Sequence, residues 1–162
     1  MSERPTLASA ISYRDPEAAL KFLEAAFGFE PVMIIRDAGG ALVHSEMTLG
    51  NGLIMVGSEW DESHKSPASL GAKNTQSVHV HIASDIDGHC DRARQAGAVI
   101  EMAPSDQFYG DRTYRARDLE GHIWTFGQTV KPMKASEWDK SGQVKTWVRP
   151  GSAYEGEPAS AA

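Results

Sequence analysis

The chain has 162 residues, of which 41% are hydrophobic and 23% charged, so it can form one domain, or two closely packed half-domains, with a real core. Its formal net charge of −6 argues against nucleic acid or an anionic membrane surface as partner, because both favour a basic patch. The single cysteine, Cys90, excludes an internal disulfide framework, and the sequence has neither a signal-peptide pattern nor an apolar run long enough to span a membrane. We therefore expect a cytoplasmic protein without a membrane segment.

The first third of the chain predicts a strand, a helix and three more strands. Asp15 is a good N-cap and Pro16 suits the first helical position, after which apolar residues recur at helical spacing until Gly28. The expected strands are 6–13, 31–37, 41–49 and 53–57, with a strong hairpin turn at 50–52.

After a polar connecting loop at 60–73, the same pattern begins again. Val78 and Val80 alternate with His79 and His81, which is typical of a half-buried strand. A helix follows that residues 84–85 can cap, with Cys90 on its buried, unreactive face and Gly97 as its end. The remaining expected strands are 98–103, 112–117 and 122–128.

Glycines at expected helix ends and turns recur at a constant interval, which indicates an internal repeat. Gly28 matches Gly97 and Gly52 matches Gly121, each pair 69 residues apart. The period predicts an α+β domain over residues 1–129, built from two βαβββ modules at about 6–58 and 76–128. One helix covers one face of each sheet, so the two uncovered faces can curl into a cup of mixed, mainly antiparallel strands that encloses a ligand. Whether the two modules of one cup belong to one chain or to two chains is left open.

Residues 130–162 differ from the rest in composition. Lysines, prolines and glycines recur in it, together with small residues towards the end, yet Trp138, Trp147 and Tyr154 interrupt them. We expect a C-terminal extension that packs over the domain or over a partner subunit, with roughly the last eight residues mobile.

At the level of motifs, the sequence is similar to the vicinal-oxygen-chelate superfamily, which includes glyoxalases, bleomycin resistance proteins and dioxygenases. Residues 19–29 resemble its first helix. Residues 44–55, together with 106–112 and 118–124, resemble the PhnB-like branch, which usually has Trp in place of Tyr109 and Pro in place of Leu119. The resemblance covers about 6–128 and implies the glyoxalase/bleomycin-resistance fold, a small-molecule ligand and a homodimer. It does not imply one activity, because the superfamily hosts many.

The resemblance also implies four positions at which a bound metal ion would find its ligands. Metal-dependent members hold the ion with four ligands, and these positions fall here at about Ala8, at Ile54 or Met55, at His79 and at about Thr125. Only His79 is a ligand type, so no cofactor is expected at the family position. A displaced divalent-metal site remains as the alternative, because His44 and Glu46 share one strand face and His79 and His81 share another.

Other side chains are candidates for contacts with a ligand. Phe108, Tyr109 and Arg112 lie in the segment that overhangs the cup in the family, and Trp60 offers a further aromatic wall; loop packing explains them equally well. His122 is expected to be a hydrogen-bonded core or turn residue. The complete expected ligand-binding set is His44, Glu46, Met55, Trp60, His79, His81, Phe108, Tyr109, Arg112 and Thr125.

Three functions fit this sequence. The first is a binding protein that sequesters a drug-like molecule or metabolite. The second is a metal-dependent lyase, isomerase or dioxygenase that uses the displaced site on His44, Glu46, His79 and His81. The third is metal-free acid–base catalysis, with Glu46 as base and a histidine such as His79 as acid.

Overall fold

The computed structural model describes residues 4–155, and within them none of the helices is long and apolar enough to cross a membrane. The strands are β1 (Ala8–Tyr13), β2 (Glu30–Arg36), β3 (Leu42–Leu49), β4 (Gly52–Ser58), β5 (Val78–His81), β6 (Val99–Asp106), β7 (Asp111–Arg117) and β8 (Ile123–Thr129). The helices are α1 (Pro16–Phe27), α2 (Ile86–Gln95) and the short α3 (Ala135–Trp138), with single 3₁₀ turns η1 (Pro67–Ser69) and η2 (Asp139–Ser141).

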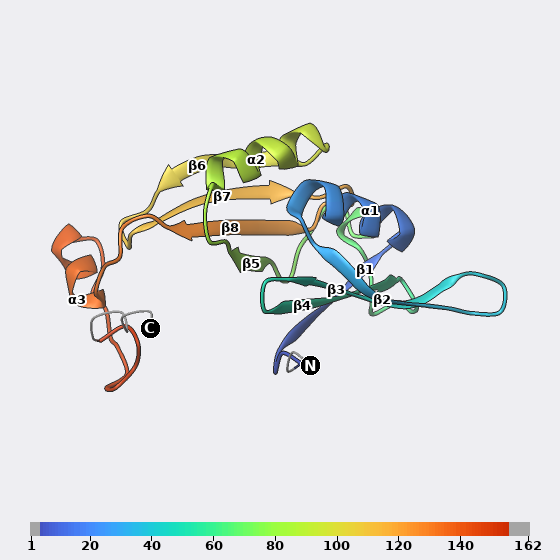
Figure 1. Ribbon diagram of the computed structural model, residues 1–162, viewed down its shortest axis with the longest axis horizontal. Coiled ribbons are helices and arrows are strands. Elements are labelled where there is room, and N and C mark those ends of the chain that lie inside the picture. Colours follow the sequence, from blue (N-terminus) through green and yellow to red (C-terminus); the bar gives the residue numbers. More distant parts are fainter. Residues whose placement is uncertain (1–3, 156–162) are drawn as a thin grey trace.

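The strands form two four-stranded sheets with the same topology (Figure 1). Sheet A has the order β1-β4-β3-β2 and sheet B the order β5-β8-β7-β6. In each sheet the first strand of the module pairs in parallel with its last strand, and the other pairs are antiparallel. The predicted duplication of a βαβββ unit in an α+β fold is therefore confirmed.

Helix α1 begins and ends where its sequence predicts. The Asp15 carboxylate accepts a hydrogen bond from the backbone N–H of Ala18 at 3.0 Å, and Pro16 needs no partner at the first helical position. At the other end Gly28 adopts a left-handed conformation with φ of 78° and donates to the Glu24 carbonyl at 3.1 Å. The side chains on one face of the helix, among them Leu23 and Phe27, are fully buried.

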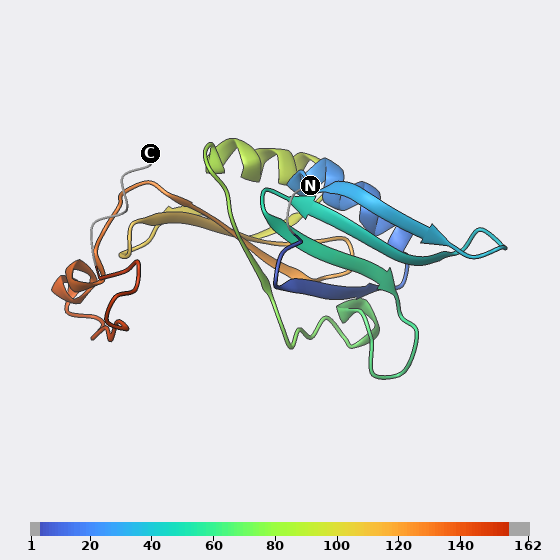
Figure 2. The ribbon, with the colours of Figure 1, turned by 60° about the horizontal axis from the view of Figure 1, so that its bottom comes forward.

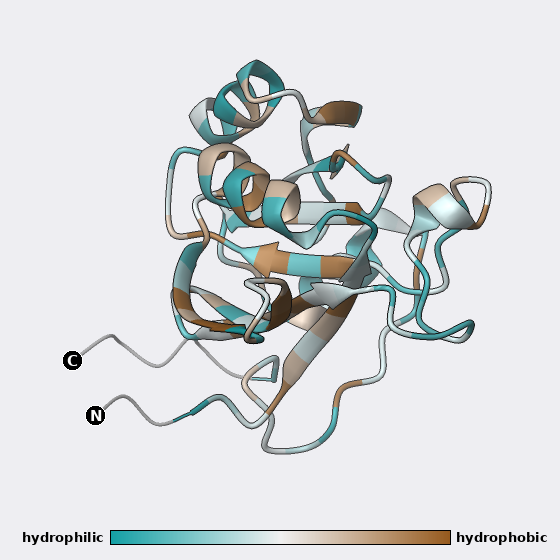
Figure 3. Ribbon diagram, turned by 90° about the vertical axis from the view of Figure 1, so that its right-hand side faces the viewer, coloured by the Kyte–Doolittle hydropathy of each residue, from teal (hydrophilic) through white to brown (hydrophobic). Residues whose placement is uncertain are grey.

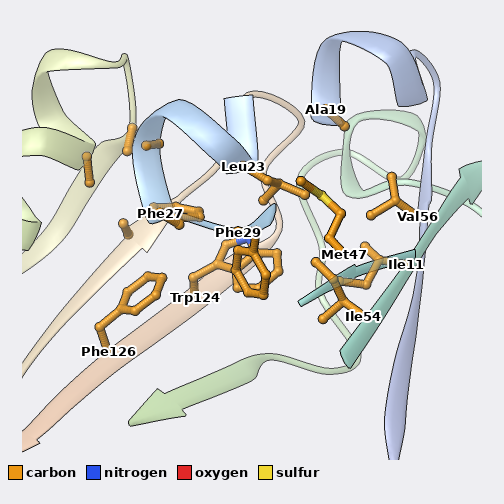
Figure 4. Packing of buried hydrophobic residues seen from close by; sticks show 14 of the residues in the cluster. Ile11, Ala19, Leu23, Phe27, Phe29, Met47, Ile54, Val56, Trp124 and Phe126 are labelled. Atoms are coloured by element: carbon orange, nitrogen blue, oxygen red, sulfur yellow. The ribbon is translucent and has the colours of Figure 1, made fainter. Parts of the chain in front are cut away.

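The hydrophobic core joins the two modules (Figure 4). Phe27, at the end of α1, packs on Trp124 and Phe126 of β8 with ring centroids 5.4 and 4.8 Å apart. Phe29 meets Trp124 at 5.5 Å, and α1 contacts α2. The helix-covered faces of both sheets thus share one interior.

A buried carboxylate reinforces this junction. Asp118, in the turn between β7 and β8, accepts hydrogen bonds from the Tyr13 hydroxyl of module 1 at 2.6 Å and from the Trp124 indole at 3.0 Å. The backbone N–H groups of Glu120 and His122 donate to its other oxygen at 3.0 Å each. A buried charge with four donors is well satisfied, so this turn anchors module 2 to module 1.

The sheets do not close on each other within the chain. Helices α1 and α2 lie on the same side of the molecule, and no helix of residues 4–155 covers the opposite faces of the two sheets (Figures 1 and 2). Polar and apolar residues alternate along several strands, as expected when only one face is covered (Figure 3). The expected cup is therefore not formed by the described residues of a single copy.

Strand β6 is longer than the expected 98–103, since it continues through Pro104 to Asp106. It is the outer strand of sheet B, with register shifts between Ile100 and Met102 and between Met102 and Ser105. A proline lacks a backbone N–H, which an edge strand with a bulge tolerates. The sequence pattern missed this because proline normally ends a strand.

The C-terminal extension leaves sheet B at the end far from sheet A (Figure 1). It begins beside the β6–β7 hairpin, where the N–H groups of Val130 and Lys131 both donate to the Gly110 carbonyl, at 3.0 and 2.9 Å. Trp138 packs edge-on against Tyr109 at 6.4 Å, while Trp147 is 81% exposed. In its own chain the extension thus packs on a hairpin tip and not over the sheets. Most of the expected mobile end, residues 156–162, lies outside the described residues.

Candidate functional site

The helix-free face of sheet A carries polar groups in an apolar setting. Ser45 and Met47 are fully buried beneath α1, so strand alternation turns His44 and Glu46 to the other face, as predicted. Glu46 pairs in register with Met55, and Met55 pairs with Ala10. These side chains form the centre of this face.

The strand register allows the two sheets to be compared at the positions where the family resemblance implies metal ligands. Ile54 is 4% exposed in the core beneath α1, so Met55 is the β4 residue on the helix-free face. In sheet B, His79 pairs with Thr125, and the corresponding pair in sheet A is Ala10 with Met55. By this pairing, Ala10 is the residue of β1 that corresponds to His79 of β5, and the expected position at about Ala8 lies two residues before it on the same strand. Alanine and a thioether do not hold a hard divalent cation.

The helix-free face of sheet B is more polar. His79 and His81 are exposed on it, and the Arg115 guanidinium donates to Thr125 Oγ1 at 3.4 Å. His81 Nε2 accepts from the Thr129 backbone N–H at 3.3 Å, which ties that imidazole to β8. His79 is left beside Thr125 and Arg115 as a group that can meet a ligand.

Gly127 forms the floor beside His79. A Cβ atom at this position would lie 3.2 Å from His79 Nε2 and 3.3 Å from Thr113 Cγ2, both tighter than ordinary contact. Glycine therefore lets the side chains of β5 and β7 approach each other across β8.

The electrostatics of sheet A centre on Glu46. Its side chain is only 8% exposed, and its Oε1 lies 3.4 Å from His44 Nε2. The same oxygen forms an ion pair with the guanidinium of Arg4, which precedes β1. A buried carboxylate is stable only with such partners, so Arg4, which precedes β1, is part of the immediate surroundings of Glu46.

The chain does not bring the displaced metal site together. His44 and Glu46 lie on sheet A, whereas His79 and His81 lie on sheet B. Across residues 4–155, no three histidine, cysteine, aspartate or glutamate side chains converge closely enough to hold a metal ion. The four-residue alternative therefore has no geometric basis within one copy.

Arg112 lies apart from the other predicted site residues. Its guanidinium binds Asp87 of α2 at 2.8 Å and Asp106 at 2.9 Å, on the helix-covered side of sheet B. The hydrogen bonds to Asp87 and then Asp106 raise the pKa of Arg112. The reason for its position is strand alternation, which gives Arg112 the same face as the buried Tyr114 and the opposite face to Arg115.

The aromatic candidates lie at the margins. Phe108 and Tyr109 pack edge-to-face at 5.3 Å at the β6–β7 hairpin tip, where Tyr109 supports the extension. Burial, and then the neighbouring Asp111, raise the pKa of Tyr109. Trp60 is 69% exposed and stacks on His64 at 4.0 Å in the connecting loop. Neither group lies at the centre of a helix-free face.

A cleft of about 190 Å³ lies at the seam between the modules, lined by β1, the connecting loop and the start of β8. Several of the polar side chains that line it are engaged in hydrogen bonds within the chain. Asn74 donates to the Gly121 carbonyl at 2.9 Å, Gln76 donates to Ser9 Oγ at 3.0 Å, and His122 binds the Ser12 carbonyl at 2.9 Å. His122 is thus the hydrogen-bonded turn histidine that was predicted, and the seam is a structural joint.

Three residues at the helix-free faces were not selected from the sequence. Arg115 could have been found, because period-2 alternation places it beside Thr125. Arg4 gave no local signal, since its position depends on the path of the chain before β1. Gly127 likewise gave no signal by itself.

The protein is of the paired βαβββ class. Its two open sheets share one core, and their helix-free faces are uncovered. The sequence profile of the Glyoxalase/Bleomycin resistance protein/Dioxygenase superfamily matches residues 7–126, and the chain belongs to that superfamily.

Individual relatives agree with this assignment. TioX from Micromonospora sp. ML1 is 31% identical, with a TM-score of 0.62 over 77% of this chain and 98% of its own. TnmS3, an antibiotic binding protein from Streptomyces sp. CB03234, is 17% identical, with a TM-score of 0.61 over 80% and 98% of the two chains, a likeness of fold. The uncharacterized protein Rv0887c of Mycobacterium tuberculosis is 27% identical over 137 residues, which are 82% of this chain and 79% of that protein.

Proposed function

We propose that this protein binds a small organic molecule in a cup shared by two copies of the chain. The helix-free face of sheet A from one copy and that of sheet B from the other form its walls. The observation that carries the proposal is that both faces present oriented polar groups, although the two faces do not oppose each other within one copy. On sheet A these groups are Glu46 and His44, and on sheet B they are His79 and Arg115. A concave, mainly apolar site with a few directed polar groups is the usual form of a small-molecule pocket.

The charges of the two faces support pairing of unlike modules. Glu46 in sheet A and Arg115 in sheet B occupy corresponding register positions, opposite Met55 and Thr125 respectively. A cup from sheet A and sheet B opposes a carboxylate with a guanidinium, whereas two like sheets would oppose equal charges. The twofold pairing of two copies gives two such cups.

The residue types favour binding over metal chemistry. Three of the four family metal positions hold Ala10, Met55 and Thr125, and only His79 could ligate a hard divalent ion. Binding alone requires only walls and oriented polar groups. TnmS3, an antibiotic binding protein of the same fold, is an example of such a role. The motif resemblance to the PhnB-like branch and action in the cytoplasm, which suits the single buried thiol of Cys90, are further parts of this proposal.

The test uses two blocking substitutions. Met55→Trp fills the sheet A wall and Thr125→Trp the sheet B wall, and each variant alone is expected to lose binding of the ligand found by thermal-shift screening of bleomycin and aromatic antibiotics. When differently tagged variants are refolded together, a mixed dimer has one cup with both walls intact, so roughly a quarter of the sites should return. Cups formed within one chain would give no recovery and would refute the shared site.

A metal measurement separates the enzyme alternative. Protein purified without chelators is expected to contain no stoichiometric transition metal, and ligand binding should be insensitive to EDTA. Near-stoichiometric zinc, nickel, iron or manganese that is lost in His79→Ala would overturn the binding role in favour of a metal-dependent lyase, isomerase or dioxygenase.

A further inference from the structure

The Glu46 carboxylate is held in an unusual setting. It lies in the middle of β3, between Met33 of β2 and Met55 of β4 on the helix-free face of sheet A. Its polar partners in the described part of the chain are the Arg4 guanidinium and the His44 imidazole. A carboxylate that is 8% exposed and flanked by two thioethers requires a positive partner, because burial without one costs several kcal/mol.

The partner it has is loosely attached. Arg4 precedes β1, an edge strand of sheet A, and its guanidinium reaches Glu46 of β3, which lies beyond β4 in the strand order. The Arg4 side chain is 67% exposed and the neighbouring Leu7 is 85% exposed. Among the side-chain hydrogen bonds of the described residues, the Arg4–Glu46 pair is the one that fastens this segment to the sheet. Few hydrogen bonds must break when Arg4 leaves Glu46, so this segment can be displaced at low cost.

We infer that Glu46 receives a positively charged group of the ligand, an amine, amidine or guanidinium, and that Arg4 occupies this position until the ligand arrives. The inference rests on the proposed function and names the ligand class of its cup. The ligand's cation replaces the Arg4 guanidinium in a charge-assisted hydrogen bond to the carboxylate. An anionic or neutral group at the same place would leave Glu46 with only the His44 imidazole, at 3.4 Å, as a polar partner once Arg4 is displaced.

Arg4 then acts as a tethered competitor. Because it is joined to β1 by a few residues, its effective concentration at Glu46 is on the order of millimolar, and it lowers the apparent affinity of any cationic ligand. The polar groups of sheet B, His79 and Arg115, would meet hydrogen-bond acceptors elsewhere on the ligand. The preferred molecule has a cation at one end and oxygen or nitrogen acceptors at the other.

The test compares benzamidine with benzamide, which have the same shape but differ in charge, in NMR titrations of the full chain. Benzamidine is expected to bind at least ~10-fold more tightly than benzamide, with shifts at β3 and β4, and its affinity should fall with salt. Arg4→Gln should raise the affinity for benzamidine ~3-fold to 10-fold and leave that for benzamide unchanged. Glu46→Gln should abolish the preference for the charged probe.

Arg36→Gln is the matched control, because Arg36 also pairs with a carboxylate, Glu17, at an exposed position away from Glu46. It should leave both affinities unchanged. Equal binding of the two probes, no binding of either, or an unchanged benzamidine affinity in Arg4→Gln would overturn the inference. The Arg4→Gln result does not depend on whether Glu46→Gln folds. The mixed dimer of Met55→Trp and Thr125→Trp can recover ligand binding while benzamidine and benzamide bind equally. In that case the proposed function stands and only the cation site is refuted.

Discussion

The two modules have the same fold, but their helix-free faces differ in chemical character. In sheet A the central positions hold Ala10, Met55 and Glu46, whereas the corresponding positions in sheet B hold His79, Thr125 and Arg115. One face is apolar around a single carboxylate, and the other is polar and cationic. Backbone register was retained after duplication, while side chains that do not support the core diverged. The difference indicates that the faces have separate tasks and are suited to each other more than to their own kind.

The helix-covered sides differ as well. The last residue before the β3–β4 turn of module 1 is Leu49, whereas the corresponding residue before the β7–β8 turn of module 2 is Asp118, which reaches Tyr13 of module 1. The buried residues of α1 are apolar, but α2 includes His89, whose imidazole lies between the Tyr114 hydroxyl and the Phe27 carbonyl. Module 2 thus supplies the polar groups that fasten the pair together.

The strongest test of this asymmetry removes the Asp118 carboxylate. Asp118→Ala leaves the Tyr13 hydroxyl, the Trp124 indole and two backbone N–H groups without their acceptor, and is expected to lower the free energy of unfolding by about 3 kcal/mol. Urea denaturation followed by tryptophan fluorescence measures it. Asp106→Ala, at an exposed ion pair with Arg112, is the control and should have little effect. A loss as small as the control's would mean that the junction depends on apolar packing alone.

The next test sharpens the contrast between the two sides of sheet B. Arg115→Ala should weaken ligand binding about tenfold, because its guanidinium lies on the proposed cup wall. Arg112→Ala, three residues away but directed towards α2, should leave the affinity unchanged. Calorimetric titration of both variants decides the matter. Equal losses would mean that the β7 face assignment does not define the cup.

Acid should act on module 2 through His89. Burial lowers its pKa from the usual 6.5, so the unfolded chain binds this proton more readily than the folded one. Its contribution to stability is therefore complete above pH 6.5 and is lost as the pH falls below that value towards the folded pKa. The melting temperature of the wild type should fall more steeply below pH 6.5 than that of His89→Gln. Parallel curves for the two proteins would remove His89 as the acid-sensitive group.

The smallest effect is expected from the extension, which only module 2 carries. Deleting residues 130–162 removes the Trp138 ring from Tyr109 but leaves the common core untouched. The free energy of unfolding should change by less than about 1 kcal/mol in denaturant titration. A larger loss would make the extension an integral part of the second module.

Much of this architecture was predictable because it depends on local rules. Glycines, caps and the strand period fixed the elements, and alternation correctly separated His44 and Glu46 from Ser45 and Met47. Strand alternation would also have excluded Arg112 from the site, because Arg112 shares a strand face with the apolar core residue Tyr114. The register of Met55 required its neighbours across the sheet, and the approach of Arg4 to Glu46 depends on a chain path between residues 42 positions apart. Long-range pairs of this kind leave no trace in local sequence.

The aromatic cluster of Phe27, Phe29, Trp124 and Phe126 has a consequence for the history of the protein. Once the duplicated halves had merged their interiors, each lost its autonomy, since a separated half would present these rings to water. Calorimetry should therefore record one endotherm for the domain. Splitting the gene between residues 58 and 78 should yield two insoluble fragments that become soluble only when they are expressed together.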